Sequence, residues 1–210
     1  MALLPTAAGG HDTHQKGNAM YRKMLFFVLF LGLAFTLFGR GTRDGSGADD
    51  ERLVTQGDFV LRGTVLVQYL GRDQNVIIPA NLGITEIGEG AFEKSGIRSV
   101  SIPEGVERIE RAFGDCLELA EVFLPSTLRI IGDHAFFDCS SLVSIRIPSG
   151  VTSIGNWAFY GTGLAGISIP AGITTVGDCA FANIRNLVEI SVDEQNPAFT
   201  SRDGILFSRA

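Results

Sequence analysis

The feature that most constrains this chain is a phrase that recurs five times at a nearly fixed interval. It reads SIPAGITTVGDCAF at residues 168–181, and related phrases begin at Ile77, Ser101, Phe123 and Arg146. Successive prolines of the phrase are 22 to 24 residues apart, and successive Ala-Phe pairs are 21 to 23 apart. Because two separate markers keep one period, the sequence predicts a tandem array of a single structural unit. The prolines are Pro79, Pro103, Pro125, Pro148 and Pro170, and the Ala-Phe pairs end at Phe92, Phe113, Phe136, Phe159 and Phe181.

Each unit predicts two extended segments and a turn. Ahead of the proline, the pattern L-x-x-I-x-I alternates apolar and polar residues, which is typical of a strand with one buried face. After the proline, a V-x-x-I-G segment such as residues 151–155 predicts a second strand and then a turn into Ala-Phe. We expect glycine to give that turn its backbone freedom and the Phe ring to fill the coil interior. The strand positions ahead of each proline are Ile97, Val100, Ile102; Leu119, Val122, Leu124; Leu142, Ile145, Ile147; Leu164, Ile167, Ile169; and Leu187, Ile190, Val192.

The string I-P-x-x-V-T-S-I-G-x-x-A-F, followed by C-x-x-L, resembles the BspA-like, treponemal-type leucine-rich repeat. The resemblance covers roughly residues 58–207. It implies a mostly β leucine-rich repeat solenoid of about five coils of 22–23 residues with capping hairpins. It also implies adhesion at the cell surface, with extracellular-matrix proteins or other host proteins as partners. One unit departs from the pattern, because residues 109–113 lack the glycine and one further residue. We therefore expect a tighter turn in that coil.

The N-terminal part predicts export. An unbroken apolar run of 15 residues spans 24–38, directly after the basic residues Arg22 and Lys23. That length suits the apolar region of a signal peptide or a short membrane anchor, and either one engages the membrane at least during export. Whether the run is cleaved stays open. The predicted division is 1–23 leader, 24–38 apolar segment, 39–52 linker, 53–75 capping hairpin, 76–190 repeats, and 191–210 terminal hairpin or start of a further unit.

The charge and residue content of the repeats exclude several functions. Residues 1–48 carry a net charge of +3 and residues 49–210 one of −9, which weighs against nucleic acid or an anionic membrane surface as partner of the repeats. The three histidines, His11, His14 and His134, do not converge with other metal ligands in the sequence pattern. The chain has no G-x-S-x-G nucleophile elbow. We therefore expect a protein without catalytic residues, metal or cofactor.

The cysteines admit two interpretations. Cys116 and Cys139 each lie three residues after the repeat Phe, so they occupy one position on adjacent coils, about 5 Å apart by strand spacing. That proximity permits a disulfide in an exported protein, or a ladder of buried free thiols. The family resemblance favours the ladder. Cys179 precedes its Ala-Phe pair and is interpreted as a turn residue.

The outward positions of the strand ahead of each proline form the candidate protein-binding surface. Phe123 is an aromatic where the neighbouring coils place small polar groups, and Arg146 follows it on the next coil. Aromatic residues and arginine dominate interface energetics, so this pair is a candidate anchor. The alternative is a solvated sheet face with one stray aromatic. The predicted function is an exported adhesion module at the cell surface, in the periplasm or secreted, and the alternative is a scaffolding protein that binds other components inside the envelope. The candidate residues are Ser99, Ser101, Glu121, Phe123, Ser144, Arg146, Gly166, Ser168, Glu189 and Ser191.

Overall fold

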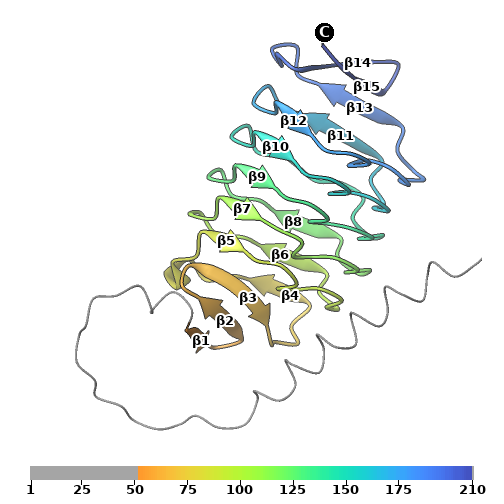
Figure 1. The fold of residues 1–210 in the computed structure, drawn as a ribbon. Coiled ribbons are helices and arrows are strands. Elements are labelled where there is room, and N and C mark those ends of the chain that lie inside the picture. Colours follow the sequence, from red (N-terminus) through yellow and green to blue (C-terminus); the bar gives the residue numbers. More distant parts are fainter. Residues whose placement is uncertain (1–51, 210) are drawn as a thin grey trace, which may run out of the picture. The chain divides into compact units, whose positions relative to one another are not determined.

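The fold was obtained as a computed structural model and is described for residues 52–209 (Figure 1). This part of the chain is a stack of β coils with one short 3-10 helix, Ala80–Leu82. None of the helical structure within residues 52–209 has the length and apolar character that a membrane crossing requires. The leader, the apolar segment at 24–38 and nearly all of the predicted linker lie outside the described residues.

One side of the stack is an eight-stranded sheet. Its first three strands are antiparallel, and from the third strand onward each coil adds one short parallel strand. Every parallel step pairs equivalent residues, so that Ile87 lies beside Ile109 and Ile109 beside Ile131. These isoleucines are fully buried, which fixes the register because a one-residue slip would turn them to solvent. The strands, in sheet order, are β1 (Leu53–Gln56), β2 (Phe59–Arg62), β3 (Val65–Tyr69), β5 (Glu86–Ile87), β7 (Arg108–Ile109), β9 (Ile130–Ile131), β10 (Ser153–Ile154) and β12 (Thr175–Val176).

The strands ahead of the prolines form a second side, which we call the strand face. Three strands pair in parallel at its N-terminal end: β4 (Asn75–Ile77), β6 (Ser99–Ser101) and β8 (Glu121–Phe123). Two more pair at its C-terminal end: β11 (Gly166–Ile169) and β13 (Glu189–Val192). β4 belongs to a coil that precedes the five predicted strand positions.

The strand face is interrupted in the coil between β8 and β11. Residues 142–148 were expected to form a strand and do not, so that prediction is wrong. Their side chains still alternate, since Ser144 and Arg146 are exposed whereas Ile147 is buried. Alternation reports which side chains face the core, but it does not report whether neighbouring backbones come within hydrogen-bonding distance. The sequence pattern therefore predicted the burial correctly and the ladder incorrectly.

A column of stacked aromatic rings runs through the coil interior, as expected. Phe92, Phe113, Phe136 and Phe159 are at most 2% exposed. Adjacent ring centroids along this column are 5.0 to 5.4 Å apart, and Phe181 extends it at 5.7 Å. Each ring therefore packs on the ring of the coil before it, and no coil closes its core alone.

The coil that lacks one residue turns more tightly, also as expected. Ala112 N–H donates to the carbonyl of Glu110, only two residues earlier. In the regular coils the corresponding bond spans three residues, from Ala91 N–H to Gly88 O at 3.2 Å and from Ala135 N–H to Gly132 O at 3.4 Å.

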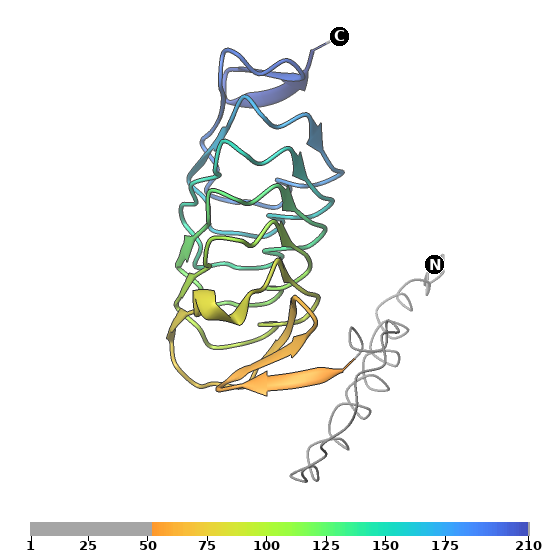
Figure 2. The ribbon, with the colours of Figure 1, turned by 90° about the vertical axis from the view of Figure 1, so that its left-hand side faces the viewer.

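Hairpins cover both ends of the described stack (Figure 2). β2 and β3 are antiparallel at the N-terminal end, and β14 (Phe199–Arg202) and β15 (Ile205–Ser208) are antiparallel at the C-terminal end. Asn196, 1% exposed, secures the second hairpin. Its Nδ2 donates to the carbonyls of Pro170 and Ile173, while its Oδ1 accepts from two backbone N–H groups at the start of β14.

Candidate protein-binding surface

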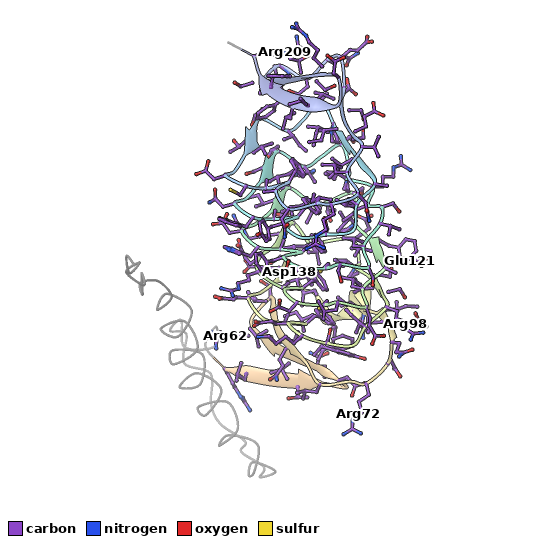
Figure 3. The ribbon with its side chains drawn as sticks, turned by 90° about the vertical axis from the view of Figure 1, so that its right-hand side faces the viewer. Arg62, Arg72, Arg98, Glu121, Asp138 and Arg209 are labelled. Carbon is purple, nitrogen blue, oxygen red and sulfur yellow. The ribbon has the colours of Figure 1, made fainter. Side chains whose placement is uncertain are left out.

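The structure places the predicted surface residues in two register-matched groups. In the first group, Ser99 pairs with Glu121 and Ser101 pairs with Phe123. Figure 3 shows Glu121 projecting from the same edge of the stack as Arg98 of the preceding coil. In the second group, Gly166 pairs with Glu189 and Ser168 pairs with Ser191.

Ser144 and Arg146 lie on the interrupted coil between these groups. Both are exposed, but neither is a ladder partner of β8. Within residues 52–209, Arg146 forms no ion pair with any carboxylate. Its guanidinium is therefore available to a partner, although the structure does not couple it to Phe123 through the ladder.

Phe123 borders a hollow that sequence reasoning did not find. The hollow has a volume of about 390 Å³ and is lined by Asn75, Val76, Ile77, Ser99, Ser101 and Phe123. Ser101 pairs with Ile77 on one side and with Phe123 on the other. The two apolar side chains are 77% and 59% exposed, so they flank the small serine as two projecting walls.

The strand pattern did not predict Ile77 as a surface residue, because the first coil departs from that pattern. Asp73 stands where the other coils have the leading Leu or Ile. The signal that could have found it is the register of Pro79, which is preceded by Val76 and Ile78 just as the later prolines are preceded by two apolar residues.

Polar groups line and border this hollow. Ser99 Oγ donates to Asn75 Oδ1 at 2.8 Å. One residue before Ser99, Arg98 Nε lies 3.2 Å from Glu118 Oε2 in an exposed ion pair. No titratable side chain lines the hollow itself. An apolar centre with a polar border suits the docking of a protein side chain better than acid–base chemistry.

A second apolar strip lies on the strand face in the C-terminal coils. Val143 and Val188 are 55% and 83% exposed, and the exposed Ala165 lies between them. Backbone bonds hold the three in register: Ala165 N–H donates to Val143 O at 3.1 Å, and Val188 N–H donates to Ala165 O at 2.9 Å. Each one directly follows the leading Leu of its coil. The candidate surface residues come from the alternating part of the strand, so they do not include this position.

Cys116 and Cys139 form the ladder of buried free thiols. Cys116 and Cys139 are fully buried and unbonded to each other, whereas Cys179 is exposed in its turn, as expected. Burial raises the pKa of Cys116 and raises that of Cys139 well above the ordinary thiol value. No group of three or more His, Cys, Asp or Glu side chains within residues 52–209 is arranged to hold a metal ion. His11 and His14 lie outside the described residues.

Comparison with known proteins places these observations in context. The family model of the BspA type leucine rich repeat region matches residues 72–112 and 110–202, in six copies. The crystal structure of a T. pallidum leucine-rich repeat protein is 28% identical, with a TM-score of 0.59, over 70% of this chain and 71% of that one. A leucine-rich repeat protein from Bacteroides ovatus is 30% identical with a TM-score of 0.53, over 68% of this chain and 38% of that one.

A third solved structure shares the fold alone. The pneumococcal vaccine antigen PcpA is 21% identical with a TM-score of 0.54, over 77% of this chain and 55% of that protein. The search of curated proteins found no match.

Proposed function

Since this chain belongs to the BspA-type leucine-rich repeat family, we propose that it is an exported protein-binding module that acts in adhesion at the cell surface. Repeat solenoids expose long regular surfaces and bind proteins through them. The proposed partners are host extracellular-matrix proteins, and the proposed contact surface is the strand face.

The observation that carries this proposal is the pair of exposed apolar side chains around Ser101. Ile77 and Phe123 are the first and third residues of one outward column, and a hollow lies between them. Soluble surfaces rarely expose large apolar side chains together unless a partner covers them. An aromatic and an aliphatic wall around a hollow have the anatomy of an interface hot spot.

The second apolar strip extends the same face. Val143, Ala165 and Val188 add an exposed row in the C-terminal coils. Adjacent coils of a parallel ladder are about 4.8 Å apart, so the two apolar patches are separated along the stack by a distance that an extended partner segment can span. The exposed Arg146 lies on the same coil as Val143.

Export is proposed from the apolar run at residues 24–38 and the basic residues before it. The first test is protease accessibility of the repeats on intact cells that produce the full chain, with an internal protein as control. Cleavage of the repeats while the control survives is the result expected of an adhesin. Protection until the envelope is opened would refute surface exposure and would instead favour the scaffolding role inside the envelope.

The binding surface is tested with two matched double variants of the full chain. Ile77→Ala/Phe123→Ala removes both walls of the hollow and should weaken binding to purified extracellular-matrix proteins by about tenfold or more. Ile205→Ala/Phe207→Ala removes the same two side-chain types from the C-terminal hairpin, where they are 58% and 46% exposed. Equal binding by both variants and the unmodified chain would remove the strand-face hollow as the contact site.

A further inference from the structure

Four aromatic side chains gather on the turn side of two adjacent coils; we call His134, Phe137, Trp157 and Tyr160 the aromatic cluster. His134 stacks on Trp157 with ring planes 5° apart and centroids 6.3 Å apart. Phe137 stacks on Tyr160 at 8° and 5.1 Å. Within each coil the rings also touch, with Trp157 and Tyr160 centroids 4.9 Å apart. All four residues are half-buried, so each keeps part of its surface in contact with solvent.

The repeat does not require these rings. The interior Phe column already supplies the aromatic core of every coil, and the aromatic cluster occurs in only two of them. In the next coil the cluster meets the smaller Cys179 and Ala182, so the outer faces of Trp157 and Tyr160 are not covered by further rings. The equivalent positions in the other coils are Gly90, Arg111 and Cys179 for the His134 column and Glu93, Gly114 and Ala182 for the Phe137 column.

The left-handed turn at the cluster belongs to the repeat. His134 and Trp157 have φ angles of 54° and 57°, and the equivalent Gly90 and Cys179 have φ angles of 73° and 55°. The backbone conformation is therefore shared with coils that lack the rings, and the side chains alone distinguish these two coils.

The surroundings of the cluster are negatively charged. A hollow of about 520 Å³ adjoins His134 and contains four carboxylates and one guanidinium in its lining, which consists of Glu86, Glu89, Glu110, Arg111, Asp133 and His134. Glu110 pairs with Arg108 at 2.8 Å, and Asp133 accepts hydrogen bonds from the uncharged Asn156. Residues 52–209 as a whole carry twelve basic and eighteen acidic side chains.

His134 adds little positive charge to this region. Burial and, after it, the nearby Arg111 lower the pKa of His134, which favours its neutral imidazole. Figure 3 places Asp138, which follows Phe137, away from the edge that carries Arg98 and Glu121. The aromatic cluster is therefore a surface separate from the strand face.

We propose that the aromatic cluster and the carboxylate-lined hollow beside it form a docking surface for an arginine-bearing basic segment of a protein partner. A guanidinium stacks on aromatic faces and binds carboxylates through paired hydrogen bonds, and this surface offers both groups side by side. Lysine offers the charge without the planar stacking group. The inference goes beyond the proposed adhesive role of the strand face and does not depend on it.

The test uses the intrinsic fluorescence of the full chain, because Trp157 is its one tryptophan and lies in the surface itself. The probes are peptides of about twelve residues in which glycine alternates with arginine, lysine or glutamate. We expect the arginine peptide to change the fluorescence saturably, the lysine peptide to bind about fivefold more weakly, and the glutamate peptide not to bind. Equal binding of the arginine and lysine peptides, or no saturable change with either, would overturn the proposal. A response to a neutral oligosaccharide such as cellohexaose, with none to the peptides, would overturn it in favour of a carbohydrate surface.

Variants separate the two components of the surface. Tyr160→Ala should weaken the arginine peptide about fivefold. Glu86→Gln/Glu89→Gln should weaken it by a similar factor at about 50 mM salt and by less at about 300 mM. Both variants are checked for an unchanged far-ultraviolet circular dichroism spectrum, and the carboxylate variant decides the matter if Tyr160→Ala does not fold. Unchanged affinity in a folded variant contradicts the proposal. Ile77→Ala/Phe123→Ala is the control that should bind the arginine peptide normally, so failure of the strand-face proposal is distinguished from failure of this one.

Discussion

The Cys139 thiol donates a hydrogen bond to the main-chain carbonyl oxygen of Phe113, 3.1 Å away on the preceding coil. Cys116 makes the same bond to Phe92 O at 2.9 Å one coil earlier. The thiol column therefore links each coil to the one before it. Each S–H group adds a second donor to a carbonyl that already accepts a backbone N–H group, from Cys116 to Phe113 O at 3.3 Å and from Ser95 to Phe92 O at 3.0 Å.

The three thiols should differ sharply in reactivity. Burial raises the pKa of Cys116 and Cys139, which disfavours the reactive thiolate, whereas Cys179 is exposed. A colorimetric thiol assay of the native protein at about pH 8 should find one fast-reacting group. The same assay in denaturant without reductant should find all three. Fewer than three groups in denaturant would indicate a disulfide and contradict the thiol ladder.

Phe136 should be far more important for stability than Phe123. The Phe136 ring is fully buried between Phe113 and Phe159, whereas Phe123 is 59% exposed. Phe136→Ala should therefore lower the free energy of unfolding by about 3–5 kcal/mol, through lost burial and the cavity left behind. The same substitution at Phe123 should cost less than about 1 kcal/mol. Urea unfolding of the two variants measures the difference, and equal costs would contradict the interior column.

Gly155 should not tolerate alanine, because neighbouring coils approach each other closely there. An added Cβ would lie 2.5 Å from the backbone nitrogen of Asp133 and from the carbonyl carbon of Gly132. Gly155→Ala should cost about 1–3 kcal/mol, since the two coils must move apart. Gly96→Ala is the matched control, because nothing lies within 4 Å of its added Cβ. The control should leave the urea midpoint unchanged or raise it slightly, and a tolerated Gly155→Ala would contradict the coil spacing.

Asp138 should make stability depend on pH. Burial and, after it, the neighbouring Asp115 raise the pKa of Asp138 above the ordinary carboxyl value. The folded state therefore favours the protonated form, and this contribution to stability is lost as the pH rises through the raised pKa. Asp138→Asn keeps a residue that accepts the left-handed φ of 54° and removes the charge. It should be more stable than the unmodified chain at pH 7, by less than about 1 kcal/mol, and the difference should shrink below about pH 4.

The control for Asp138→Asn is Asp203→Asn. Asp203 has a φ of 52° but is exposed in the terminal hairpin, so the change tests the backbone effect without the burial. Thermal unfolding at several pH values measures both variants. An advantage of Asp138→Asn that persists at pH 3, or one that Asp203→Asn shares, would contradict the electrostatic explanation.

Sequence reasoning predicted the coil interior well and the exterior less well. The Phe residues of the Ala-Phe pairs mark a position that the fold must repeat, because each ring stacks on its counterpart in the next coil. The sequence gives no sign that the strand at Ser144 and Arg146 is missing. Hydrogen bonding between coils depends on the spacing of their backbones, which the alternation of side chains does not encode.

The spacing of the aromatic residues in the sequence could have predicted the aromatic cluster. His134 and Trp157 are 23 residues apart, as are Phe137 and Tyr160, which is the period of the coil. That spacing alone places the rings in two stacked pairs. Their partial exposure could not be predicted, because the spacing shows which rings stack but not how far neighbouring side chains cover them.

The register of the ladder sets the distance between the two ends of the stack. Bonds between adjacent coils join residues about one period apart, such as Ser153 with Ile130 and Thr175 with Ser153. Figure 1 shows β1 and β15 at opposite ends of the described stack, so its two hairpins never meet. Each coil advances the stack by one fixed step of about 4.8 Å. The repeats therefore act as a spacer of set length, in which the number of coils decides how far the C-terminal hairpin stands from the N-terminal one.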